Sequence, residues 1–345
     1  MTGSIVGFGS SFPPLLDQQE AWDGFFSTHF SDSRLARRVW RTAGIERRHS
    51  AVDPRTEDLS NATTGSRMDR FVELAVPLAC DAVIKGLHAS GMSAGDVELL
   101  TVVSCTGYAT PGVDILVARQ LGMQSSLQRL HVGHMGCYAA LPALAATADA
   151  ASARGKVGVV LCVELTSLHL QPPTEDLEQI VAHALFSDAA AVAVIVPDSP
   201  GLQIVDVVAR TDLETADLMT WRVTDLGFRM RLSPKVPAVL DKHLLAVTTE
   251  LLHRHQLCIS DIDHWAIHPG GPRIIDTVAR RLELDSQDVS ASRDTLREHG
   301  NCSSATTLLV LEELSKRTDI TAGQHVVAMA FGPGLTLYTM LLRAR

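Results

Sequence analysis

Three residues of this sequence have side chains that together could transfer an acyl group. Cys137 directly follows a glycine and precedes a stretch rich in Ala and Leu, so it stands at the predicted start of a helix. His268 lies between the apolar run Trp-Ala-Ile and the loop Pro-Gly-Gly-Pro, and Asn301 lies between Gly300 and Cys-Ser-Ser. A cysteine can act as the nucleophile, a histidine as its base, and His and Asn as donors to a developing oxyanion.

Each of these residues also has an ordinary structural explanation. A free cysteine is most often a small buried hydrophobe, a loop histidine can cap the next helix, and asparagine is a preferred helix N-cap. At a helix start, however, unpaired backbone N–H groups and the helix dipole favour the thiolate of Cys137. The acyl-transfer interpretation therefore depends on whether the fold brings three separate loops to one site.

The elements that must position these loops follow from the apolar pattern. Short β-branched runs predict strands buried on both faces, and longer runs at helical spacing predict helices. The predicted strands cover residues 98–104, 156–163, 189–196, 262–267, 325–331 and 336–342. The predicted helices cover residues 71–90, 139–153, 238–255, 274–284 and 304–316. This alternation indicates an α/β layered fold, in which His268 stands at the carboxyl end of a strand, where such sheets bind ligands.

A faint internal repeat divides the chain into two halves. The cluster Pro-Asp-Ser-Pro-Gly at 197–201 is the clearest boundary, and it separates residues 1–198 from residues 199–345. Each half has a buried strand, a glycine that opens a helix of small residues, and further strands. We expect the site to form where the two halves meet.

Composition and charge exclude several classes of protein. The 345 residues include 46% hydrophobic residues and carry a formal net charge of −9, which argues against binding to nucleic acid. We expect no membrane span and no secretory signal. The six cysteines form no CxxC pair and the histidines are scattered, so we expect a reduced, cytoplasmic protein without a disulfide framework or a metal.

Motifs along most of the chain resemble those of a known family. From Ile5 to the C-terminus, the sequence is similar to the type III polyketide synthases, the chalcone synthase-like enzymes found in bacteria and plants. The most specific segments are His-Pro-Gly-Gly-Pro and Phe-Gly-Pro-Gly-Leu-Thr, and Gly-Asn-x-Ser-Ser is shared with wider relatives. In order, the matching segments are 103–112, 136–137, 162–165, 184–191, 226–228, 267–274, 300–304 and 331–336.

The resemblance implies a fold and a set of site residues. The fold is the thiolase fold, with two pseudo-repeated βαβαβ halves in an αβαβα arrangement that works as a homodimer. In this fold Cys137 is the nucleophile, with His268 and Asn301 as its catalytic partners. The resemblance places further residues as gatekeepers (Phe186 and Phe228), in the substrate cavity (Cys105, Thr166, His169, Met219 and Ser303), near the cavity of the partner (Thr110) and at the CoA phosphates (Arg38, Arg41 and Arg273).

The implied activity is a decarboxylating Claisen condensation. An acyl-CoA starter is loaded on Cys137, malonyl-CoA loses CO₂ and extends the chain, and cyclisation releases a pyrone or resorcinol-type product. CoA thioesters are the substrates, and the reaction requires no metal or redox cofactor.

Three alternatives compete with this interpretation. A ketoacyl synthase III-like enzyme would carry out one condensation with acyl carrier protein, but it lacks the Gly-Pro-Gly-Leu-Thr ending. A papain-like hydrolase has a similar Cys-to-His spacing, but its nucleophile stands near the N-terminus in a different motif. A degenerate thiolase-fold binding subunit is disfavoured because all three catalytic positions are filled.

The sequence departs from the family pattern near the cavity. Ser187 and Ala189 replace two common glycines, and Ala189 is expected to narrow the backbone near the gatekeeper. His169 stands where many relatives have a small residue, and Met219 aligns with the same cavity. Because protein interiors pack densely, we expect the larger side chains to reduce the cavity and favour short products. In the alternative, His169 turns away and bonds to a backbone carbonyl.

Overall fold

The computed structural model describes residues 2–317 and 320–345, and its strands form one large mixed sheet. The sheet has nine strands in the order β11-β12-β13-β8-β1-β7-β6-β4-β5. Strands β4, β5 and β6 are mutually parallel, as are β11 and β12, and the others pair antiparallel. The nine strands are β1 (Gly3–Ser11), β4 (Leu99–Ser104), β5 (Gln128–Gly133), β6 (Gly158–Glu164), β7 (Ala189–Pro197), β8 (Leu202–Thr211), β11 (His264–Ile267), β12 (His325–Gly332) and β13 (Thr336–Ala344).

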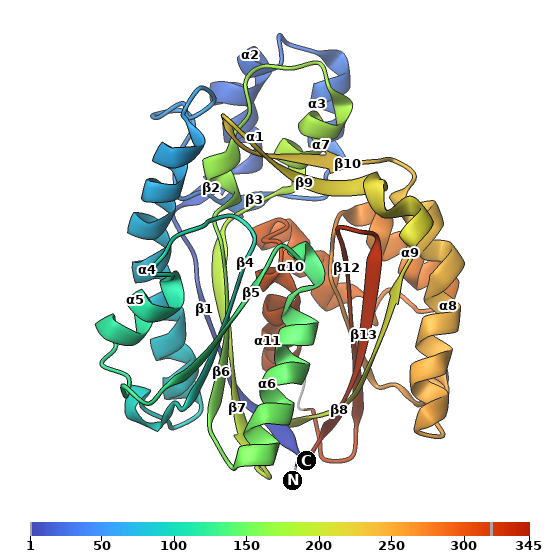
Figure 1. Cartoon of the computed structure of the whole chain (residues 1–345). Helices are drawn as coiled ribbons and strands as arrows, with labels where there is room; N and C mark the ends of the chain where they lie inside the picture. The colour runs from blue at the N-terminus through green and yellow to red at the C-terminus, as the bar shows by residue number, and fades with distance from the viewer. Residues whose placement is uncertain (1, 318–319) are drawn as a thin grey trace.

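Two halves of this sheet belong to two halves of the chain. They join where β1 pairs with only two residues of β8, at Ser4–Gln203 and Ile5–Leu202. Helices α6 (Ala140–Arg154) and α11 (Ala305–Arg317) contact strands of both halves, so they form a central layer (Figure 1). Helix α4 (Thr64–Ala89) covers β1 and β7 from outside, and α8 (Val236–Arg254), which also packs on α9 (Pro272–Leu282), covers β8 and β13. The predicted αβαβα arrangement is therefore confirmed.

The buried strands and helices follow the apolar pattern. Strands β4 and β6 are buried at every position, which matches their nearly continuous apolar runs. The observed bounds differ from the predicted ones by a few residues at most ends. Helix α4 begins seven residues earlier than predicted, because the Thr63 side chain accepts a hydrogen bond from the Ser66 N–H and caps it.

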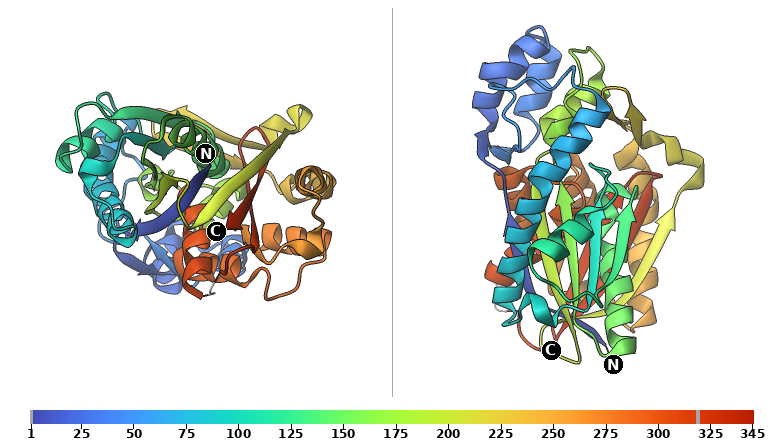
Figure 2. Two further views of the ribbon diagram at one scale, coloured as in Figure 1. Left: turned by 90° about the horizontal axis from the view of Figure 1, so that it is seen from below. Right: turned by 60° about the vertical axis from the view of Figure 1, so that its left-hand side comes forward.

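Three strands of the large sheet, β1, β5 and β8, were not predicted, and neither were the elements that form a cap over the sheet. The N-terminal segment contains four short helical elements next to a small sheet, and the chain later forms a two-stranded hairpin. Figure 1 shows these elements above the sheet, at the end opposite both termini, and Figure 2 shows the termini together at the other end. The remaining elements are β2 (Leu15–Asp17), α1 (Gln18–Ala21), η1 (Trp22–Phe26), α2 (Ser27–His29), α3 (Arg34–Arg41), β3 (Arg47–His49), η2 (Ala94–Asp96), α5 (Val113–Gln120), η3 (Gly136–Tyr138), η4 (Thr166–His169), α7 (Leu177–Leu185), η5 (Leu213–Leu218), β9 (Met219–Thr224), β10 (Gly227–Leu232), η6 (Ile259–Asp261) and α10 (Ser290–His299).

The loops that carry the candidate residues leave the sheet at one end. Cys137 follows β5, His268 follows β11, and Asn301 lies between α10 and α11. The carboxyl ends of β4, β5 and β6 face the same way because these strands are parallel, and ligand sites of α/β sheets lie at such ends. Within the described ranges, no helix is both long enough and apolar enough to cross a membrane.

Candidate active site

Cys137 is held in a tight turn between β5 and α6. It is the middle residue of η3, a single 3₁₀ turn, and its side chain is buried. Gly136 before it has a φ of +74°, and a Cβ at that position would stand 2.5 Å from Cδ of Pro333. The turn therefore requires glycine. The Cys137 Sγ lies 3.7 Å from Oγ of Ser303.

Burial controls the protonation of this thiol. It raises the pKa of Cys137 to about 12, and this effect outweighs the lowering by hydrogen bonding with the Ser303 hydroxyl and with the backbone. Burial therefore outweighs the expected preference of the helix start for a thiolate at Cys137. A base must remove the proton before Cys137 can act as a nucleophile.

His268 is the candidate base, and it lines the same cavity as Cys137. Its backbone N–H donates to the Met329 carbonyl at 2.8 Å, which continues the pairing of β11 with β12. Its side chain is buried, and within the described part of the chain neither ring nitrogen has a hydrogen-bond partner. Burial lowers the pKa of His268 to about 3, so the ring is neutral. A buried unpaired imidazole is costly and is typical of a catalytic role.

Asn301 is fixed so that its amide N–H groups remain available. Its Oδ1 accepts the Ser303 N–H at 2.9 Å and the Thr306 hydroxyl at 3.4 Å. The Asn301 backbone exchanges two hydrogen bonds with the segment around Phe186, from Asn301 N–H to the Leu185 carbonyl and from Ser187 N–H to the Asn301 carbonyl, both 2.9 Å. Nδ2 is left as a donor toward the cavity that Asn301 lines.

One cavity of about 380 Å³ contains all three residues, and we call it the catalytic cavity. The structure thus brings Cys137, His268 and Asn301 together from loops far apart in the sequence. Phe186, Met219, Arg38 and Arg273 also line this cavity, as the resemblance implies. Most other lining side chains are aliphatic and come from α3, α7, β10 and α8; they include Leu35, Val39, Val181, Leu185, Met230, Leu232, Val236 and Leu240.

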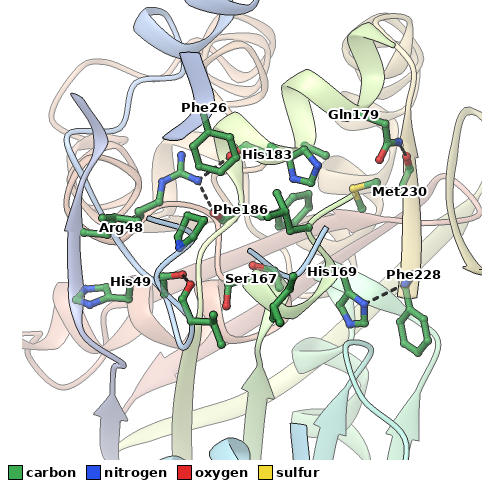
Figure 3. Close-up of a pocket in the computed structure, with 18 of the residues that line it drawn as sticks. Phe26, Arg48, His49, Ser167, His169, Gln179, His183, Phe186, Phe228 and Met230 are labelled. Carbon is green, nitrogen blue, oxygen red and sulfur yellow. Dashed lines mark hydrogen bonds between the residues drawn. The ribbon is translucent and has the colours of Figure 1, made fainter. Parts of the chain in front are cut away.

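A second, smaller space adjoins the catalytic cavity, and we call it the second chamber. It measures about 60 Å³, and Phe186 and Met230 line both spaces (Figure 3). Phe228, Thr166 and His169 line only the second chamber. Of the two expected gatekeepers, Phe186 therefore lies between the two spaces, and Phe228 lies in the wall of the second chamber.

Cys105 and Ser303 were expected in the substrate cavity, but neither lines either of the two spaces; Ser303 instead contacts Cys137 from within the protein, and Cys105 contacts Ser303. The Ser303 Oγ is 3.4 Å from Sγ of Cys105, so one hydroxyl contacts both thiols. Cys105 also contacts Glu164, a fully buried carboxyl that accepts hydrogen bonds from Thr106 Oγ1 at 2.7 Å and Ser304 Oγ at 2.5 Å. Burial raises the pKa of Glu164, although these hydrogen bonds oppose the shift.

Other expected residues lie away from the two cavities. Arg41 and Thr110 are exposed, and neither lines the catalytic cavity or the second chamber. Ser187 is buried against β3, where its Oγ accepts the His49 N–H at 2.8 Å. Ala189 starts β7 in the core and lines neither cavity, so the expected narrowing near the gatekeeper is wrong.

Two residues near the gatekeepers were missed by the sequence analysis. Arg48 is buried and donates to the carbonyls of His183 and Phe186 at 2.7 and 3.0 Å, so it fixes the end of α7. Trp221, on β9, donates from Nε1 to the Cys105 carbonyl at 2.7 Å. The alternation of apolar and polar residues over 219–232 could have predicted the hairpin that carries Trp221.

The fold and this trio of cysteine, histidine and asparagine define a condensing enzyme of the thiolase fold. The chain belongs to the chalcone and stilbene synthase family. Residues 3–200 match the model "Chalcone and stilbene synthases, N-terminal domain", and residues 204–345 match the corresponding C-terminal domain. The chain is thus a type III polyketide synthase, an acyltransferase that carries out decarboxylative condensation.

Named relatives and solved structures agree with this assignment. The chain is 35% identical to the alpha-pyrone synthesis polyketide synthase-like Pks18 of Mycobacterium tuberculosis, over 98% of this chain and 90% of that protein. It is 33% identical to 1,3,6,8-tetrahydroxynaphthalene synthase of Streptomyces peucetius, over 91% and 84%. The crystal structure of PKS-I from the brown alga Ectocarpus siliculosus superimposes with a TM-score of 0.93 at 28% identity, over 100% of this chain and 98% of that one.

Proposed function

We propose that this enzyme loads an acyl-CoA starter on Cys137, extends it with malonyl-CoA and releases a short cyclised polyketide. The observation that carries this proposal is the catalytic cavity, whose wall holds Cys137, His268 and Asn301, while both ring nitrogens of His268 lack a hydrogen-bond partner among the described residues. Similarity to an alpha-pyrone synthase and a tetrahydroxynaphthalene synthase supports an aromatic or pyrone product.

The first half-reaction transfers the starter to the enzyme. His268 takes the proton of the Cys137 thiol, and the resulting thiolate attacks the carbonyl carbon of the thioester. The bond from that carbon to the CoA sulfur breaks, and the CoA thiolate that leaves takes the proton from His268. The buried thiol needs this transfer because its own pKa is too high for it to ionise at neutral pH.

The second half-reaction forms the new carbon–carbon bond. Malonyl-CoA loses CO₂, and the electron pair left behind forms an enolate on the thioester oxygen. The N–H donors of His268 and Asn301 stabilise this oxygen, and removal of one such donor typically costs about 10²–10³ in rate. The enolate carbon then attacks the acyl group on Cys137, and the sulfur leaves as a thiolate, which takes up one proton from water.

The substrates enter through the side of the cavity that faces α3 and α9. Arg38 and Arg273 line this side, and their charges suit the phosphates of CoA. Arg41 lies one turn further along α3 and is exposed, so it can meet the same phosphates from the surface. CoA thioesters supply all the reacting groups, and the proposed reaction uses no metal or redox cofactor.

Product formation with and without the nucleophile tests this proposal. The purified protein, mixed with malonyl-CoA and a panel of acyl-CoA starters, should release CO₂ and pyrone or resorcinol products. Intact-mass spectrometry should show one starter-sized adduct, and Cys137→Ala should abolish both the adduct and the products. The variant should still release CO₂ from malonyl-CoA, because His268 and Asn301 are intact.

Two results would contradict the proposal. An adduct that survives Cys137→Ala would remove Cys137 from the role of nucleophile. A wild-type enzyme that makes a single β-ketoacyl product only from malonyl groups on acyl carrier protein would favour the ketoacyl synthase alternative.

A further inference from the structure

His169 occupies a central place beside the second chamber. It ends η4, its side chain is 3% exposed, and it lies between the hairpin β9–β10 and the loop that follows β4. Because the catalytic steps use other residues, this buried imidazole needs a separate explanation. Its contacts supply one.

Both nitrogens of this ring bond to the backbone. The Phe228 N–H donates to Nδ1 of His169 at 3.0 Å (dashed in Figure 3), so Nδ1 carries no proton. Nε2–H therefore donates to the Thr106 carbonyl at 2.7 Å. Burial lowers the pKa of His169 to about 4, which keeps the ring in this neutral form at physiological pH.

The ring also packs on the gatekeeper that it bonds. Its plane stacks on Phe228 at 4.4 Å between centroids and 10° between planes, and it meets Trp221 edge-on at 5.5 Å. The stack and the hydrogen bond together fix both the backbone and the ring of Phe228. A side chain that only filled volume would make the stack without the two hydrogen bonds.

Trp221 ties the same hairpin to the same loop. Its Nε1 donates to the Cys105 carbonyl, one residue before the Thr106 carbonyl that His169 reaches. The Cys105 thiol in turn contacts Ser303, which contacts Cys137. The hairpin is therefore placed relative to the nucleophile through hydrogen bonds on two adjacent carbonyl groups.

This hairpin forms walls of both spaces. Met219 lines the catalytic cavity, Phe228 lines the second chamber, and Met230 lines both. A shift of the hairpin would change the volume of these two spaces, which is available to an acyl chain that grows on Cys137. Packing alone resists such a shift less specifically than a pair of directional bonds.

We propose that His169 is a positioning residue that holds Phe228 and the β9–β10 hairpin against the 105–106 loop and thereby sets the length of the polyketide released. The inference rests on the proposed function, since it requires the enzyme to extend an acyl chain. It replaces simple loss of cavity volume as the reason for short products, because the hydrogen bonds of His169, and not its size alone, carry the effect.

Two substitutions separate the hydrogen bonds of His169 from its ring. In His169→Gln, the amide oxygen can accept the Phe228 N–H and the amide nitrogen can donate to the Thr106 carbonyl, but the ring is lost. In His169→Phe, the ring and its stack remain and both hydrogen bonds are lost. His264→Phe is a matched control, since that imidazole contacts Gln324 at 3.3 Å and lines neither cavity.

Product masses and malonyl-CoA decarboxylation are measured for each variant with one starter. His169→Phe should shift the ratio of longer to shorter products by about fivefold or more, the change expected from the loss of one net hydrogen bond. His169→Gln and His264→Phe should keep the wild-type ratio. Decarboxylation should stay within about twofold in all variants, because His268 and Asn301 are unchanged.

Each outcome decides the inference. A wild-type product ratio in His169→Phe, or equal shifts in the Gln and Phe variants, would overturn it. If His169→Phe fails to fold, Trp221→Phe removes the neighbouring bond with a smaller change and should shift the ratio in the same direction; no shift there counts against the inference. A wild-type protein that makes no polyketide would instead refute the proposed function.

Discussion

At the scale of single residues, the proposed reaction depends on transfer of the Cys137 thiol proton to His268, and burial of both groups opposes this transfer. The pKa of Cys137 is raised to about 12 and the pKa of His268 is lowered to about 3, both by burial. Burial therefore disfavours both the Cys137 thiolate and the His268 imidazolium when either forms by itself. Contact between Sγ and the free imidazole nitrogen would allow the two charges to form as a pair, each stabilising the other.

This dependence predicts how the thiol reacts with iodoacetamide. In His268→Gln, alkylation of Cys137 at pH 7 should be slower than in wild type by about tenfold or more, because no base takes the proton. Its rate should then rise nearly tenfold per pH unit from pH 7 to pH 10, because the thiolate fraction rises that way well below a pKa of about 12.

The exposed Cys258 serves as the internal control for this experiment. Its alkylation, measured by peptide mass mapping in the same samples, should be the same in both proteins. Equal rates for Cys137 in wild type and His268→Gln would show that His268 does not activate the thiol.

The three residues that meet in the catalytic cavity could be predicted from the sequence because each lies in a local motif with its own signal. A glycine elbow, a strand followed by Pro-Gly-Gly-Pro, and a Gly-Asn turn are all readable over a few residues. The contacts of His169 and Trp221 are not local: they join residues 59 to 116 positions apart. Only the packed structure decides whether the His169 ring fills the cavity or bonds to the backbone.

At the scale of elements, the turn before α6 places the nucleophile. Gly136 precedes Cys137 with a positive φ and packs on the Pro333 ring, so the turn and the segment at the end of β12 fit each other closely. Gly155 ends the same helix with a similar φ of +65°, and nothing lies within 4 Å of a Cβ built there. The two glycines thus share a backbone conformation but differ in their surroundings.

This difference predicts unequal effects of alanine at the two ends of α6. Gly155→Ala should lower the free energy of unfolding by about 1–2 kcal/mol, the cost of a left-handed conformation, and leave kcat/KM unchanged. Gly136→Ala carries the same cost in the free energy of unfolding, and the new Cβ also displaces Cys137 or Pro333. Because a shift of about 1 Å at a catalytic group can cost about 10² in rate, this variant should also lose kcat/KM. Urea unfolding and product formation measure both quantities; equal kcat/KM values for the two variants would contradict this account.

Six of the nine strands of the large sheet were predictable, whereas β1, β5, β8 and the cap were not, for a physical reason. Strands such as β6 and β7 are buried on both faces, so their apolar runs identify them without knowledge of the rest of the fold. The hairpin β9–β10 is partly exposed and gains its position from His169 and Trp221. Its pattern is weaker because its stability depends on tertiary contacts.

At the scale of the whole molecule, the nine-stranded sheet has an exposed edge at β5. Among the described strands, β4 is the one partner of β5, and the first four residues of β5, Gln128 to His131, are exposed. Leu130 in its middle is 47% exposed, which leaves an apolar side chain beside unpaired backbone groups. An open edge of this kind pairs readily with another strand, and a two-fold axis would join two copies of β5 antiparallel. The homodimer implied by the family resemblance fits this edge.

The dimer can be tested by a charge at that edge. Leu130→Arg would place two like charges close together across the two-fold axis and should weaken dimerisation by about tenfold or more, since like charges across paired strands destabilise the pair. Sedimentation across a concentration series measures this change. Ile84→Arg, on the outer face of α4 and 54% exposed, adds the same charge to an apolar surface position and should leave the dimer intact.

The same variant tests whether the partner completes the cavity. The resemblance places Thr110 near the cavity of the other protomer, and Thr110 is exposed in the single chain. If Thr110 lies near the partner's cavity, the Leu130→Arg variant should change its product ratio at concentrations where it is monomeric. It should still release CO₂ from malonyl-CoA at the wild-type rate, because Cys137, His268 and Asn301 lie within one protomer. A wild-type monomer, or a Leu130→Arg dimer of unchanged affinity, would exclude assembly through β5.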